Sequence, residues 1–278
     1  LPALVSIIIR HMRLFSLCLF SACLAFGDDA LLRREAVASA LSYIESAHER
    51  TLESQVKIAE IAAPTFHEQE RARYMASEFR RVGLENVEVD KQGNVLGWRP
   101  GESEDVMVLA AHLDIAFDPS VNTKVRKDGA RWFGPGLGDD SRGLTDLLVI
   151  AEALNAAKIR THQTILFVAN VGEEGNGDLN GVHYLFQEAR YRDRLRAFIS
   201  IDGWEPASIT TGGTGVKRYR IVLHGSGGHS YADFGRASAI HAAARIIDRL
   251  SSMQVPKTPK TTFNVGRING GKIGRAHV

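Results

Sequence analysis

The sequence contains very little cysteine. Cys18 and Cys23 are the only two thiols among 278 residues, and both lie in an apolar N-terminal stretch that we interpret as a cleaved leader. The mature chain would then hold no thiol at all. This absence excludes a cysteine nucleophile, cysteine-ligated zinc and a disulfide framework.

The N-terminal stretch has the pattern of a secretory signal peptide. Met12 and Arg13 precede an unbroken apolar run over residues 14–26, and small residues follow before Asp28. The run is shorter than the roughly 20 residues that a membrane helix needs, so no stable membrane span is expected. We expect residues 1–27 to be upstream residues plus a signal peptide of a secreted or periplasmic protein. A lipid on Cys23 is the rival outcome.

The charge of the chain is nearly balanced. The last six residues, 273–278, resemble the translation of a sequencing adapter, so we expect the natural protein to continue past Lys272. Without Arg10, Arg13 and Arg275, 31 basic side chains face 32 acidic ones. Such a balance provides no basic face, and a nucleic-acid partner is not expected.

The hydrophobic pattern predicts an α/β fold. Three apolar runs without alternation indicate buried strands, and helical patterns separate them, which is typical of a mostly parallel sheet sandwiched by helices. A capping box, Thr65 with Glu68, should open a helix that Gly83 closes. The predicted strands cover residues 87–89, 95–98, 106–111, 164–171 and 197–201, and the other predicted helices cover residues 31–61, 144–157 and 182–196.

Polar side chains gather where the predicted strands end, which is where parallel sheets place their sites. Each cluster alone has an ordinary explanation, as a surface turn, an acidic turn or a helix N-cap. Together they place one histidine and several carboxylates at one sheet edge, where they would repel one another without a cation. These are ligands that divalent metals accept. The clusters are His112-Leu113-Asp114, Asp139-Asp140, Glu173-Glu174 and Asp202.

At these residues the chain resembles the M20 family of metallopeptidases (M20/M25/M40 type), which includes di- and tripeptidases, glutamate carboxypeptidases and N-acyl amino acid deacetylases. The resemblance covers residues 45–272 and implies a zinc-exopeptidase-like catalytic domain, here 28–211, with an inserted lid. Its motifs are Ala111-His112-Leu113-Asp114, Gly134-Pro135-Gly136-Leu137-Gly138-Asp139-Asp140, Glu173-Glu174-Gly175, Ile201-Asp202 and Gly225-Ser226-Gly227-Gly228-His229-Ser230.

The resemblance also implies a role for each site residue. His112 and Asp202 would hold one divalent metal, Asp139 would bridge two, and Glu174 would hold the second together with a histidine from a segment beyond Lys272. Glu173 would be the general base, and the carboxylate of Asp114 would accept the free ring N–H of the ligand histidine. The two metals are expected to be zinc, with cobalt or manganese as alternatives.

Residues 212–272 resemble the first half of the M20 lid and dimerisation domain. The pattern predicts a strand at 217–224, a helix at 238–253 and a strand at 261–268, and the resemblance implies a homodimer through this lid. His229 would stabilise the oxyanion, often in the partner's site; a histidine in a mobile glycine turn is the alternative. M28 aminopeptidases share a similar ligand set but lack the lid, which favours M20.

The sequence therefore predicts a two-metal hydrolase that cleaves peptide bonds of small peptides with a metal-activated water and a glutamate base. An N-acyl amino acid amidohydrolase with the same water chemistry is the alternative within the enzymes. A catalytically silent member that kept the fold for binding or dimerisation is the alternative from another class. Substrate, amino- or carboxypeptidase polarity and metal identity stay open at this point.

Overall fold

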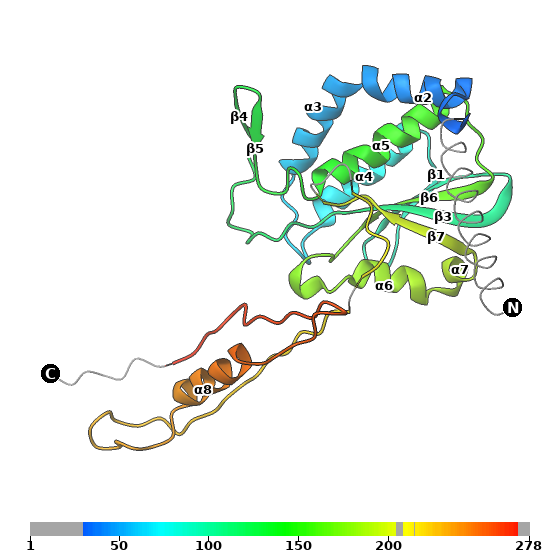
Figure 1. Cartoon of the computed structure of the whole chain (residues 1–278). Helices are drawn as coiled ribbons and strands as arrows, with labels where there is room; N and C mark the ends of the chain where they lie inside the picture. Colours follow the sequence, from blue (N-terminus) through cyan, green and yellow to red (C-terminus); the bar gives the residue numbers. More distant parts are fainter. Residues whose placement is uncertain (1–29, 204–207, 214, 272–278) are drawn as a thin grey trace, which may run out of the picture. The chain divides into compact units, whose positions relative to one another are not determined.

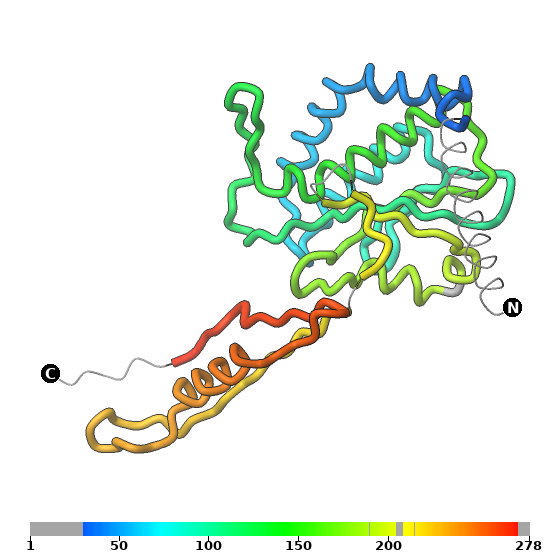
Figure 2. Tube along the Cα trace, in the orientation of Figure 1, coloured from blue at the N-terminus to red at the C-terminus, as the bar shows by residue number. Residues whose placement is uncertain are grey.

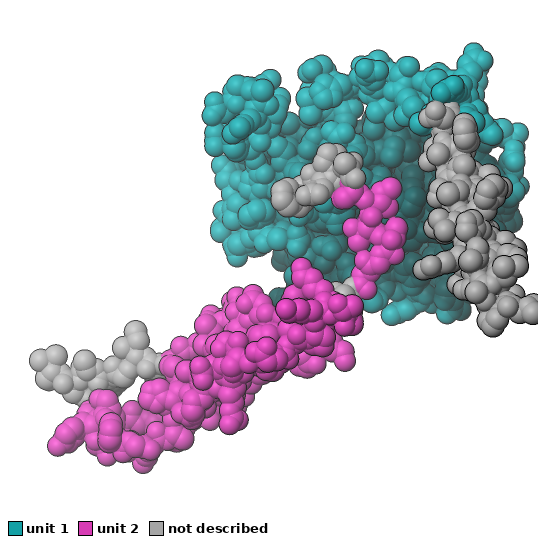
Figure 3. All heavy atoms as spheres, in the orientation of Figure 1, with its two compact units in different colours: residues 1–206 teal, residues 207–278 magenta. Residues whose placement is uncertain are grey.

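The computed structural model describes residues 30–203, 208–213 and 215–271 (Figure 1). The chain divides into two compact units, one up to residue 206 and one from residue 207 (Figure 3). The expected signal peptide and the six C-terminal residues lie outside the described residues. Within the described residues, no helix is both long and apolar enough to cross a bilayer.

The helix expected at 31–61 is divided in two. Helix α2 covers Glu35–Ser46 and helix α3 covers His48–Ala59. The Thr51 hydroxyl donates a hydrogen bond to the carbonyl of Ala47, at the junction, over 2.9 Å. Such a bond to the residue four positions earlier bends helices, and it accounts for a break that the hydrophobic pattern does not show.

The expected capping box is wrong. Helix α4 covers Gln69–Arg81, and no side chain caps its start. The Thr65 hydroxyl donates instead to Asp114, and Glu68 accepts the main-chain N–H of Gly172. Sequence spacing gives the two side chains the right positions for a local cap, but partners from the sheet take their hydrogen bonds. The predicted end of the helix is confirmed, because Gly83 follows α4 with a φ of +82°.

The five-stranded sheet confirms the expected α/β fold. Its three parallel strands stand in the order β6, β3, β7, and two antiparallel strands, β2 and then β1, extend it beyond β6. A separate two-stranded hairpin, β4 with β5, precedes the glycine-rich loop. The strands are β1 Glu85–Val89, β2 Val95–Arg99, β3 Ser103–His112, β4 Arg126–Asp128, β5 Arg131–Phe133, β6 Gln163–Asn170 and β7 Leu195–Ser200.

Helices cover both faces of the sheet (Figure 1). Helix α5, Ser141–Ala156, packs with α4 on one face, and α2 and α3 pack on α5. The short helices α6, Asn180–Gln187, and α7, Ala189–Arg192, cover the other face. Strand β3 serves both cores, because Leu109 and Ala111 join the first cluster of buried side chains while Val108 and Ala110 join the second. This double burial explains the apolar runs without alternation.

The second unit contains helix α8, Ala239–Ser251, close to the predicted bounds. The Ser238 side chain caps it by accepting the N–H of His241 over 3.3 Å. The strands expected at 217–224 and 261–268 do not form. Both segments are extended (Figure 2), but they find no ladder partner among the described residues. A strand needs a hydrogen-bonded neighbour, so the apolar pattern of these two segments was not enough to predict strands.

Candidate metal centre

The candidate centre lies at the carboxyl ends of the parallel strands. His112 is the last residue of β3 and is paired in register with Asn170, the last residue of β6. Ile201 follows β7, and its N–H donates to the carbonyl of Ala110 over 2.8 Å. The glycine-rich loop before α5 supplies Asp139 and its neighbour Asp140. Three strand ends and one helix start therefore deliver polar side chains to a single edge.

His112 is buried, with only 2% of its surface exposed. Its Nδ1 atom lies 3.0 Å from the main-chain oxygen of Asp114 and 3.5 Å from the nearer carboxylate oxygen, so we take the carbonyl as the acceptor of the ring N–H. Its Nε2 atom lies 2.8 Å from Oδ1 of Asp139. Burial would lower the pKa of His112, but the interactions with Asp114 and Asp139 outweigh burial and raise it to about 11.

Two groups of side chains offer atoms that could hold a cation. His112, Asp139 and Glu174 form one group, and His112, Asp140 and Asp202 form the other, with the offered atoms of each group within 4.8 Å of one another. His112 belongs to both. The four ligands that the sequence predicts, His112, Asp139, Glu174 and Asp202, thus fall within these two groups.

Asp139 and Asp140 differ in the exposure and the hydrogen-bond partners of their side chains. The Asp140 side chain caps α5 by accepting the N–H of Gly143, and its second oxygen accepts the N–H of His112, both over 2.9 Å. Only 1% of Asp140 is exposed, whereas 64% of the Asp139 side chain is. Burial raises the pKa of Asp140 to about 8, although His112 and two main-chain N–H groups oppose the shift. Asp139 is therefore the accessible carboxylate of the pair, and Asp140 is the residue that binds the main chain of His112.

The Asp114 carboxylate is fully buried and binds the turn that follows β6. Its Oδ1 accepts the N–H of Glu173, and its Oδ2 accepts the N–H of Glu174 and the hydroxyl of Thr65, each over 2.9 Å. Burial raises the pKa of Asp114, but the interaction with His112 and the two N–H groups more than offset it, and the pKa is lowered. Asp114 thus stays ionised and holds the Glu173-Glu174 pair in place.

Glu173 and Glu174 are half-buried, and the pKa of each is raised. Burial is the main cause for both. For Glu173, His112 opposes the shift while the negative charge of Asp202 adds to it. For Glu174, the charges of Asp139 and Glu173 add to it. Crowding of carboxylates without a cation makes each one hold its proton more strongly.

His229 lies in the second unit and has a defined local environment. Its Nδ1 atom accepts the N–H groups of Tyr231 and Ala232, each over 3.2 Å, and its own N–H donates to Asp233 over 2.7 Å. Because Nδ1 is an acceptor, the ring proton of neutral His229 lies on Nε2. The imidazole therefore presents an N–H donor.

Sequence reasoning did not predict how several residues support the centre. Asp140, Thr65, Glu68 and the buried Arg71 bind main-chain or side-chain groups at its edge. The doublet Asp139-Asp140 before a helix carried a signal, since one member of such a pair can cap the helix while the other stays free. Nothing in the sequence marked Arg71.

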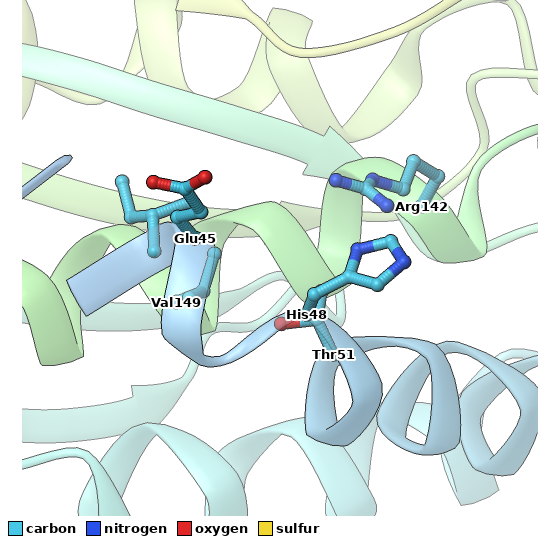
Figure 4. Close-up of a pocket in the computed structure, with 6 residues that line it drawn as sticks. Glu45, His48, Thr51, Arg142 and Val149 are labelled. Carbon is cyan, nitrogen blue, oxygen red and sulfur yellow. The ribbon is translucent and has the colours of Figure 1, made fainter. Parts of the chain in front are cut away.

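A pocket of about 200 Å³ lies elsewhere, between α2, α3 and α5 (Figure 4). Its one cationic side chain, Arg142, is paired with Asp146 at 2.9 Å. None of its residues belongs to the candidate metal ligands, and we assign no chemistry to it. The lining residues are Ile44, Glu45, His48, Thr51, Arg142 and Val149.

Two family models match the chain. The family described as Peptidase family M28 matches residues 94–214, which hold all the ligand candidates, and the family described as Peptidase dimerisation domain, M20_dimer, matches residues 211–277. The second match favours M20 over M28 peptidases, which share a similar ligand set, because it covers the predicted lid. Together the two matches support an M20-type metallopeptidase.

Known proteins support the same assignment. Carboxypeptidase G2 of Pseudomonas sp. (strain RS-16) is 23% identical over 57% of this chain and 40% of its own length. The uncharacterized protein YqjE of Bacillus subtilis (strain 168) is 27% identical over 80% of this chain and 61% of its own. A tripeptidase structure from Staphylococcus aureus shares the fold, with a TM-score of 0.50, 20% identity, and coverage of 81% and 61%. The chain thus spans about two fifths to three fifths of these proteins.

Proposed function

We propose that this M20-type protein is a two-metal exopeptidase that hydrolyses the peptide bonds of small peptides. The observation that carries the proposal is the meeting of His112, Asp139 and Glu174 at one sheet edge, with Glu173 held beside them. Asp202 joins from the end of β7. Peptidases among the relatives support the same reaction class.

The donor set fits divalent cations. It offers one imidazole and several carboxylates, which suit zinc, cobalt or manganese. Asp139 and Glu174 remain accessible to an incoming ion, while the main chain around them is tied down by buried hydrogen bonds. A cation would also relieve the repulsion that raises the pKa of both glutamates. We propose zinc as the resident metal, where His112 and Asp202 would hold one ion, Glu174 would hold the other, and Asp139 would contribute to both.

Glu173 is the proposed general base. Divalent cations, when bound, polarise the scissile carbonyl and lower the pKa of a water. Glu173 would take the proton from that water and pass it to the leaving amine. Burial is the main cause of its raised pKa, and the raised pKa suits both steps, because a base works best when its pKa approaches the working pH. Its N–H bond to Asp114 fixes the main chain from which the side chain reaches.

Asp114 and His229 have supporting roles in this proposal. Asp114 keeps the ring N–H of His112 on Nδ1 through its carbonyl, so that Nε2 is left for the metal. His229 presents an Nε2–H donor, which is the form needed to stabilise the negative oxygen of a tetrahedral intermediate.

We also propose that the protein forms a homodimer through residues 212–272. The match to a peptidase dimerisation domain supports it. Several large apolar side chains of this unit are exposed, as expected for a surface that a second copy covers. They include Tyr219, Ile221, Val222, Ile240 and Ile268. Light scattering on the full-length protein should give twice the chain mass, and a monomer at micromolar concentration would contradict the proposal.

The proposed location is outside the cytoplasm, either secreted or periplasmic. It rests on the signal-peptide pattern at residues 14–26. N-terminal sequencing of exported protein should begin near Asp28. A lipid-modified N-terminus at Cys23 would replace this proposal with a lipoprotein.

Hydrolysis by the full-length protein tests the central function. With added Zn²⁺ or Co²⁺, we expect cleavage of di- and tripeptides, and loss of cleavage on chelation. His112→Ala should abolish it, while His162→Ala, at an exposed histidine outside the site, should not. Cleavage of N-acyl amino acids alone would favour the amidohydrolase alternative. Absence of metal binding and of hydrolysis would favour a silent family member.

A further inference from the structure

A buried carboxyl group lies at the start of α4 and contacts the turn that follows β6. Glu68 immediately precedes α4 and is only 4% exposed. Its Oε1 atom accepts the N–H of Gly172 over 3.1 Å, from a segment 104 residues further along the chain. The start of a helix favours a negative charge, which eases the burial of this side chain.

The bond from Gly172 belongs to a set of three. The main-chain N–H groups of Gly172, Glu173 and Glu174 are consecutive, and all three donate to buried carboxylates. Glu68 takes the first, and Asp114 takes the second and third. The turn is therefore held by two carboxyl groups from two different segments, and Asp114 alone does not reach its first residue.

Gly172, at the first position of this turn, lies so close to a neighbouring side chain that no Cβ atom fits there. Its φ is +62°, and a Cβ added there would overlap the side chain of Asn180. The turn has no side chain of its own at its first position with which to hold its conformation. Its geometry depends on the partners of its N–H groups, and small errors there would be passed on to Glu173 and Glu174.

We infer that Glu68 is a positioning residue that fixes the turn carrying the proposed base and one proposed ligand. Glu68 touches neither substrate nor metal in this account. It acts through Gly172 on the direction in which the Glu173 and Glu174 side chains leave the turn. The inference rests on the proposed function, because that function assigns the general base and one metal ligand to this turn.

The expected effect is a loss of metal affinity without a loss of the ligands themselves. Residues that orient metal ligands from behind typically change affinity by about 10- to 100-fold when they are removed. Glu68→Ala should therefore weaken Co²⁺ binding by about that factor. Glu68→Gln keeps an oxygen acceptor for Gly172 and should lose less affinity than Glu68→Ala.

The test uses Co²⁺ titration and amide hydrogen exchange on the full-length protein. Glu70→Ala is the matched control, because it removes a carboxylate two residues away that is 74% exposed. Glu68→Asp provides a milder variant that keeps the charge but shortens the reach. Amide exchange in the peptide spanning residues 170–176 should rise in both Glu68→Ala and Glu68→Asp, and it should rise more in Glu68→Ala. Co²⁺ affinity should fall in both variants, and it should fall more in Glu68→Ala. Glu70→Ala should match the wild type in both.

The outcomes separate this inference from the proposed function. Wild-type protein that binds no Co²⁺ would overturn the proposed function, and the exchange data would still decide whether Glu68 holds the turn. Co²⁺ binding by the wild type, with equal affinity and equal exchange in Glu68→Ala, Glu68→Asp and Glu70→Ala, would overturn the inference.

Discussion

The Nε2 atom of His112 lies 2.8 Å from Oδ1 of Asp139. In the protonated ring the Nε2–H group donates to Asp139, so a proton occupies the nitrogen atom that the proposed metal would use. Burial would lower the pKa of His112, but the interactions with Asp114 and Asp139 raise it to about 11. The proposed metal binding would therefore exchange a proton for a cation at this histidine.

We predict that metal binding releases protons. At pH 7 the ring of metal-free His112 is protonated, because its pKa lies well above the pH, and a metal requires the neutral ring. Each cation bound at His112 should release about one proton, and the apparent affinity should rise about tenfold per pH unit between pH 6 and 8. Calorimetry in buffers of different ionisation enthalpy counts the protons. An affinity that does not change with pH would contradict the pairing.

A second prediction concerns the start of α5. A Cβ on Gly143 would overlap Oδ1 of Asp140 and the carbonyl oxygen of Ile201. Gly143→Ala should displace the Asp140 side chain, cost about 1 to 3 kcal/mol of stability, and weaken metal binding through His112. Gly138→Ala is the control, since a Cβ there meets nothing within 4 Å. Denaturant titration and Co²⁺ titration of both variants measure the two effects. Equal behaviour of the two variants would argue against the role of Asp140.

A third prediction concerns Arg71, which has no exposed surface. Its guanidinium donates to the carbonyls of Ala59, Ile61 and Leu113. It thereby ties the end of α3 to the residue between His112 and Asp114. Burial lowers its pKa to about 10, although the charges of Asp114 and Asp140 oppose the shift.

Arg71→Met should leave three buried carbonyls without donors and cost roughly 3 kcal/mol or more of the free energy of unfolding. Arg71→Lys keeps the charge and some of the bonds, so its cost should be smaller. Arg73→Met is the control on the solvent-facing side, where the side chain is 70% exposed, and it should change stability by less than about 0.5 kcal/mol. Urea denaturation gives all three values. A stable Arg71→Met variant would mean that other groups satisfy these carbonyls.

The sequence was most informative where strands end. The apolar runs located β3, β6 and β7 to within a few residues, and the polar residues after them could be assigned to one edge because parallel strands share a direction. His112, Glu174 and Asp202 were accordingly predictable as neighbours, whereas Asp139 lies in a loop before α5 and was assigned as a ligand through the family resemblance. The proximity of the residues at the strand ends follows from the parallel direction of the strands, which the hydrophobic pattern indicates.

Hydrogen bonds between distant segments could not be predicted in this way. Thr65 and Glu68 have the spacing of a capping box, yet each bonds to a residue far along the chain. Spacing describes only local geometry, while the choice of partner depends on packing. The expected strand at 217–224 failed for a similar reason, since β structure requires a neighbour that a local pattern does not supply.

The most direct test of the account compares Glu173→Gln with Glu174→Gln in the full-length protein. Metal content and kinetics are measured on both. Glu173→Gln removes the proposed base, so metal content should stay at the wild-type level while kcat falls by about 10²- to 10⁴-fold. Glu174→Gln removes a charged ligand, so metal should be lost and excess metal should partly restore activity. Loss of metal from Glu173→Gln with full occupancy in Glu174→Gln would reverse the two roles, and wild-type activity in both would contradict the proposed mechanism.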